Sequence, residues 1–66
     1  MLNKIIKYSE KKRLEVKKSI SGGINIYVLY EDPKRKEFES YLKRLKVKYS
    51  TRLCGNYDYV EYYIGS

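Results

Sequence analysis

Tyrosine and lysine are the side chains best suited to bind a partner in this chain of 66 residues. The chain contains nine tyrosines and no histidine. Four tyrosines fall within seven positions near the C-terminus, at Tyr57, Tyr59, Tyr62 and Tyr63. Tyrosine rings pack against flat partners while their hydroxyl groups stay hydrated or hydrogen-bonded. This spacing therefore indicates a surface suited to stacking and hydrogen bonding.

The sequence predicts no catalytic residue, no metal site and no cofactor. Without histidine, general acid–base work would fall to glutamate, lysine or tyrosine with a shifted pKa, and no group is marked out for it. Cys54 is the only cysteine, and one thiolate cannot complete a tetrahedral zinc site. We therefore expect a protein that binds a partner and is not an enzyme.

Positive charge is unevenly distributed along the chain, whose net charge is +7. Residues 1–19 hold seven basic and two acidic side chains, and residues 33–52 hold eight basic and two acidic ones. Residues 20–32 and 53–66 hold two acidic side chains each and no basic ones. Such a basic surface most often meets nucleic acid or another anionic partner, although lysine also keeps small domains in solution.

The residues after Asp32 carry the signals of an amphipathic helix. Asp32 can cap the first turn, and Pro33 suits the first helical position because its missing N–H would have no partner there. Apolar residues then recur at intervals of three and four, at Phe38, Tyr41, Leu42 and Leu45. We predict a helix over 33–46 with one apolar face.

Two hairpins flank this helix. The alternating stretch 14–20 and the β-branched and aromatic stretch 24–30 are predicted strands joined across Gly22 and Gly23. The stretches 47–54 and 57–64 form a second pair joined across Gly55 and Asn56. Residues 1–12 are predicted to be a short basic arm or helix, and residues 13–66 a single domain.

The order arm-β-β-α-β-β predicts a small α+β domain of two layers, in which one amphipathic helix packs on one face of a four-stranded sheet. Alternation along the strands separates the two faces. The helix-facing side should hold Leu14, Val16, Ile20, Ile24, Ile26, Val28, Val47, Leu53, Val60 and Ile64, with Tyr49 and Tyr62 at its margin. The other side should be open and display Lys17, Tyr27, Leu29, Lys48, Arg52, Tyr57, Tyr59, Glu61 and Tyr63.

This open side predicts a small basic protein that binds RNA or DNA with little sequence specificity. Stacking on aromatic side chains is worth about 1–3 kcal/mol per base, and lysine and arginine contact the phosphates. The tyrosines expected to stack are Tyr27, Tyr59 and Tyr63. The basic residues expected at the phosphates are Lys11, Lys12, Arg13, Lys17, Lys48 and Arg52.

The alternative prediction is a protein-interaction module, such as an inhibitor or adaptor from a mobile element, that docks on an acidic surface of a larger protein. Its contact would be the tyrosine-rich sheet face or an edge strand. The same features predict a homodimer with Tyr57, Tyr59 and Tyr63 at its interface, joined face to face or edge to edge. The segment 57–64 has no lysine, the residue that usually protects an edge strand from pairing.

No stretch of the chain approaches the roughly 20 apolar residues that span a bilayer, and the first residues do not form a signal peptide. We therefore expect a cytoplasmic protein without a membrane partner. The composition is rich in lysine, isoleucine and tyrosine and contains no alanine or glutamine. This bias fits an accessory protein encoded by a virus or plasmid.

Overall fold

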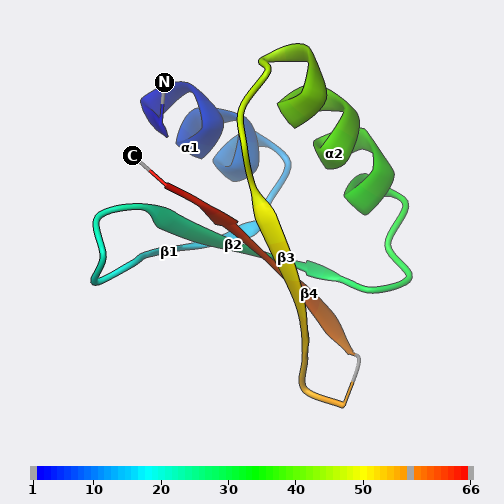
Figure 1. The fold of residues 1–66 in the computed structure, drawn as a ribbon. Helices are drawn as coiled ribbons and strands as arrows, with labels where there is room; N and C mark the ends of the chain where they lie inside the picture. Colours follow the sequence, from blue (N-terminus) through cyan, green and yellow to red (C-terminus); the bar gives the residue numbers. More distant parts are fainter. Residues whose placement is uncertain (1, 57, 66) are drawn as a thin grey trace.

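Two helices and four strands form the protein in a computed structural model, which describes residues 2–56 and 58–65. The elements are α1 (Leu2–Lys11), β1 (Glu15–Lys18), β2 (Ile24–Leu29), α2 (Lys34–Arg44), β3 (Ser50–Cys54) and β4 (Tyr59–Ile64). Both helices lie on the same side of the sheet (Figure 1). The predicted α+β fold of two layers is confirmed, and the N-terminal segment forms a helix within the helical layer.

The sheet is antiparallel throughout and has the strand order β1-β2-β4-β3. The strands β2 and β4 are central, and β1 and β3 are the edges. The prediction that the C-terminal strand could pair edge to edge with a second copy is therefore wrong, because β2 and β3 already occupy both of its sides. Its lack of lysine therefore does not mark an unprotected edge.

Both hairpins turn at the predicted residues. In the first, the N–H of Ser19 donates to the carbonyl of Gly23 at 2.9 Å, and Gly22 adopts a φ of 101°. A Cβ atom on Gly23 would collide with the carbonyl oxygen of Ile64, so a glycine lets the end of β4 approach the turn. The second hairpin turns through Gly55 and Asn56, which have φ values of 60° and 56°.

Both helices have defined ends. The side chain of Asp32 accepts a hydrogen bond of 2.9 Å from the N–H of Lys34, which confirms the predicted cap of α2. Each helix is followed by a basic residue in the left-handed region, Arg13 with a φ of 61° after α1 and Lys46 with a φ of 57° after α2. Such residues reverse the chain after a helix and satisfy its last carbonyl groups.

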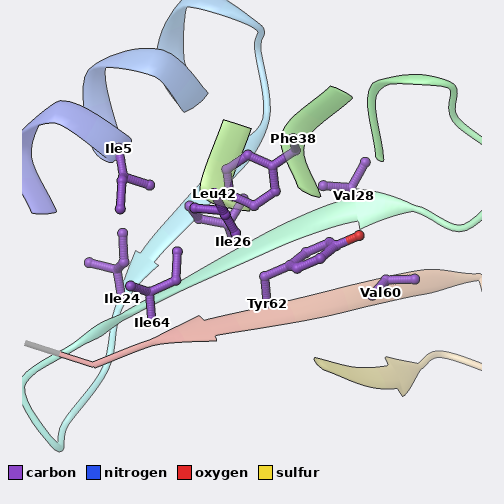
Figure 2. Close-up of a cluster of buried hydrophobic side chains, with 9 residues drawn as sticks. All are labelled: Ile5, Ile24, Ile26, Val28, Phe38, Leu42, Val60, Tyr62 and Ile64. Carbon is purple, nitrogen blue, oxygen red and sulfur yellow. The ribbon is translucent and has the colours of Figure 1, made fainter. Parts of the chain in front are cut away.

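The core lies between the two layers, and Tyr62 is at its centre (Figure 2). Its side chain is fully buried, its ring meets Phe38 edge to face at 5.1 Å, and its hydroxyl donates to Glu39 at 2.5 Å. The prediction that Tyr62 lies at the margin is wrong because β4 is central and runs beneath α2. The buried apolar residues are Ile5, Ile24, Ile26, Val28, Phe38, Leu42, Val60, Tyr62 and Ile64.

Two residues predicted to face the core do not enter it. Ile20 is fully exposed because β1 ends at Lys18 and Ile20 belongs to the turn. Leu53 has the expected parity, opposite Val60, but 45% of its surface stays exposed on the edge strand β3. The other expected contributors pack against the core while partly buried, namely Leu14, Val16, Val47 and Tyr49.

Candidate functional site on the open sheet face

The strand register sets out the face of the sheet that the helices leave uncovered (Figure 1). Across its middle, Glu15 of β1 is opposite Tyr27 of β2, which is opposite Glu61 of β4, which is opposite Arg52 of β3. The rows on either side contain Lys17, Asn25, Tyr63 and Ser50 at one end and Leu29, Tyr59 and Cys54 at the other. We call this set of residues the open face.

A network of polar contacts joins all four strands at the centre of the open face. The hydroxyl of Tyr27 donates to Glu61 Oε2 at 2.7 Å, and Arg52 Nη2 lies 3.1 Å from Glu61 Oε1. On the other side of Tyr27, Lys17 Nζ lies 5.6 Å from the centroid of the ring and 3.4 Å from Glu15. The cations of the two edge strands are thus both held close to the central tyrosine.

The network neutralises the charge of the open face itself. Its two cations, Lys17 and Arg52, are balanced by Glu15 and Glu61. The hydrogen bond to Glu61, and secondly burial, raise the pKa of Tyr27 above its ordinary value of 10.0. Tyr27 therefore stays protonated and continues to donate to Glu61 at any physiological pH.

The two other tyrosines of the open face lie two residues on either side of Glu61 along β4. Tyr59 is 42% exposed and lies opposite Leu29, which is 52% exposed. The hydroxyl of Tyr63 lies 3.0 Å from the hydroxyl of Ser21 in the first hairpin turn. Within residues 2–56 and 58–65, neither ring stacks on another aromatic ring. Both rings can therefore offer surface to a flat partner.

The predicted phosphate-binding residues fall into two groups. Lys17 and Arg52 lie on the open face, and Lys48 is exposed in the segment that leads into β3. Arg13 lies between α1 and β1 at the edge of the sheet. In contrast, the structure places Lys11 and Lys12 on the helical layer: Lys11 ends α1, and Lys12 Nζ lies 3.8 Å from Glu37 of α2. Tyr57, also predicted at an interface, lies outside the described residues.

Sequence reasoning assigns no role to Glu61, although this carboxylate holds both Tyr27 and Arg52. The alternation of residues places Glu61 on the correct face, but its partners depend on strand order, which the sequence does not reveal. A second missed contact is at the edge of the helical layer, where the guanidinium of Arg35 lies 5.0 Å from the ring centroid of Tyr30. The sequence offers one signal for the contact between Arg35 and Tyr30, which is that the two residues are close together in the chain.

Among the described residues, neither α1 nor α2 could span a lipid bilayer. In the same residues, no three cysteine, aspartate or glutamate side chains are grouped so that they could hold a metal ion. Comparison with protein families, with curated proteins and with solved structures finds no significant match to this chain.

Proposed function

We propose that this protein binds single-stranded nucleic acid, RNA or DNA, on the open face with little sequence specificity. One observation carries the proposal: tyrosines on the two central strands lie between a cation on each edge strand. Other proteins bind single strands with this combination: bases stack on aromatic rings, and basic side chains hold the phosphates. Neither interaction depends on which base is present.

The tyrosines have a spacing that suits more than one base. Tyr59 and Tyr63 are four residues apart on β4, which is about 13 Å at roughly 3.3 Å per residue. Tyr27 lies between them on the neighbouring strand, opposite Glu61. A single strand that crosses the face along β4 would therefore meet three rings in succession.

The two cations of the edge strands, Lys17 and Arg52, can still bind phosphate although each has an acidic partner. The side chain of Arg52 is 71% exposed, whereas that of its partner Glu61 is only 13% exposed. A guanidinium has five N–H donors, and Arg52 directs a single nitrogen, Nη2, at Glu61. Lys17 is similarly exposed beside Glu15. Both side chains can contact a phosphate at the rim while bases occupy the centre.

Binding of short single-stranded and duplex oligonucleotides over a range of salt concentrations tests this function. Tyr59→Ala should weaken single-strand binding by about 1–3 kcal/mol, roughly five-fold to more than a hundred-fold, and should change duplex binding much less. The matched control is Tyr30→Ala, since Tyr30 is as exposed as Tyr59 and lies near it, but it follows the end of β2 and is not part of the open face. No detectable single-strand binding at about 50 mM salt, where phosphate contacts are strong, would refute the proposal.

A second candidate function is docking on a larger protein, with an inhibitory or adaptor role. The observation in its favour is the adjacent pair Leu29 and Tyr59, both exposed at one end of a face whose charges are balanced. Apolar and aromatic groups of this kind are enriched at the centre of protein interfaces. Partners captured before and after nuclease treatment separate the two functions, because only a protein contact survives the nuclease. For either function we propose a cytoplasmic location.

A further inference from the structure

The outer surface of the helical layer concentrates positive charge that the open face lacks. Six exposed basic residues lie on the two helices, Lys4, Lys7 and Lys11 on α1 and Lys36, Lys43 and Arg44 on α2. None of the six forms an ion pair with any residue of 2–56 or 58–65. We call these six residues the helical basic surface.

Helical spacing places these residues away from the core. On α1, Ile5 and Ser9 are buried, and Lys4, Lys7 and Lys11 recur at intervals of three and four on the other side. On α2, the buried residues are Phe38 and Leu42, and Lys36 and Lys43 are two turns apart on an exposed side. The basic residues are therefore directed to solvent on the side of the molecule opposite the open face.

The packing of the helices joins the two basic stripes into one surface. The rings of Tyr8 and Tyr41 stack at 4.0 Å, and the hydroxyl of Tyr41 reaches the carbonyl of Lys4. One turn further along α1, Lys12 pairs with Glu37, which lies earlier in α2. The helices are thus antiparallel and in direct contact. The charge of Glu37 is partly neutralised by its pair with Lys12. Within Leu2–Lys11 and Lys34–Arg44, Glu10 is then the one exposed acidic side chain without a basic partner.

We propose that the helical basic surface binds the phosphate backbone of duplex nucleic acid, independently of the open face. Unpaired cations on one side of a small molecule match the regular phosphates of a duplex, whose binding releases condensed counterions. Tyr8 and Tyr41 are stacked on each other and partly buried, so they offer no free ring to an unpaired base. A lipid surface is a poorer match, because the apolar side of α1 is already used in the core around Ile5.

The two faces would then differ in what they bind. The open face stacks on bases and favours single strands, whereas the helical basic surface contacts backbone alone and accepts a duplex. Since the faces lie on opposite sides of the sheet, one molecule can hold a duplex and a single strand at the same time. This inference concerns a different surface from the proposed function and can hold or fail without it.

The test compares two triple variants that each remove three positive charges from opposite sides of the protein. The helical variant is Lys4→Gln, Lys7→Gln and Lys11→Gln, and glutamine has nearly the helix propensity of lysine. The control variant is Lys17→Gln, Lys48→Gln and Arg52→Gln. Each is titrated with a short DNA duplex at several salt concentrations, after circular dichroism has shown that it is folded.

We expect the duplex affinity of the helical variant to fall on the order of tenfold or more at low salt. Its salt dependence should become shallower by about 0.9 for each phosphate that the protein no longer neutralises. The control variant should bind the duplex nearly as the wild type does. Equal weakening in both variants, or unchanged binding by the helical variant, would overturn the proposal.

Binding of poly-glutamate as tight as that of the duplex would also overturn the proposal, because the surface would then recognise acidic chains in general. Failure of Tyr59→Ala to weaken single-strand binding would refute the proposed function and leave this inference standing.

Discussion

The hydroxyl group of Tyr27 on β2 donates a hydrogen bond of 2.7 Å to the carboxylate of Glu61 on β4, at the centre of the open face. The same carboxylate pairs with Arg52 on β3. Glu61 therefore fixes the ring of the central tyrosine and also restrains the cation of one edge strand. Its removal should change how the face binds a polyanion.

Glu61→Gln should strengthen single-strand binding several-fold at low salt. The substitution adds one net positive charge to the open face and frees Arg52 for a phosphate, which should steepen the salt dependence by about 0.7 for one added contact with a single strand. Glu37→Gln is the matched control, since it makes the same charge change on the helical layer beside Lys12. An equal gain in both variants would show that net charge alone is responsible and would contradict the role given to Glu61.

Tyr62→Phe should destabilise the protein by about 1.5–3 kcal/mol, the usual net value of a hydrogen bond to a charged group. The hydroxyl of Tyr62 donates to Glu39, which also pairs with Arg35 at 3.4 Å. Urea unfolding measures the change, with Tyr59→Phe as a control on the exposed face. A midpoint for Tyr62→Phe equal to that of the wild type would show that the buried hydroxyl contributes nothing.

The same residue makes stability depend on alkaline pH. Burial, and secondly the hydrogen bond to Glu39, raise the pKa of Tyr62 above its ordinary value of 10.0. Tyr62 contributes its full stabilisation below about pH 10. Above that pH its phenol ionises in the unfolded chain before it ionises in the folded protein, so the free energy of unfolding falls by up to about 1.4 kcal/mol per pH unit. The stability difference between wild type and Tyr62→Phe should therefore be constant from neutral pH to about pH 9 and shrink above pH 10. A difference as large at pH 11 as at neutral pH would contradict this cause of the shift.

Ile5→Ala should cost about 2–5 kcal/mol, because Ile5 is fully buried and its removal leaves a cavity between α1 and the sheet. Ile20→Ala is the control and should change stability by less than about 0.5 kcal/mol, since Ile20 is fully exposed. Thermal or urea unfolding compares the two. Similar small effects would mean that α1 is an appendage and that residues 13–66 are stable alone.

The fold class, the helix α2 and both hairpins could be predicted because each depends on local patterns. Asp32 and Pro33 mark the start of α2, and glycine marks each turn. Strand order could not be predicted, because it depends on how the second hairpin packs beside the first. That one unknown explains why local patterns alone misplace β4 at an edge of the sheet and Tyr62 at the margin of the core.

The candidate site could be predicted only in part, for the same reason. Alternation along the strands correctly brings Lys17, Tyr27, Arg52, Tyr59 and Tyr63 to one face. It cannot show that acidic partners balance the two cations, because those pairs depend on how the side chains are oriented on the folded sheet. Nor can it show that the unpaired lysines gather on the helices, since the sequence alone leaves residues 1–12 open between a short basic arm and a helix.

Of the two geometries predicted for the homodimer, the strand order leaves one, in which the open faces of two copies are in contact. Such a dimer would bury Leu29 and Tyr59, which are the large exposed apolar groups of that face. We expect light scattering to give a mass of two chains at high micromolar concentration and of one chain after addition of a single-stranded oligonucleotide, which would compete for the same surface. A mass of one chain throughout would contradict the dimer.

Chemical-shift mapping of the ¹⁵N-labelled protein during titration with a short single-stranded oligonucleotide tests the central claim most directly. Binding on the open face predicts that the first and largest shifts are at β2, β4 and the edge residues Lys17 and Arg52, with Tyr59 and Tyr63 among them. The amides of α1 and α2 should move little until the oligonucleotide is in excess. Shifts confined to the two helices, or no shifts at about 50 mM salt, where phosphate contacts are strong, would contradict a nucleic-acid site on the sheet.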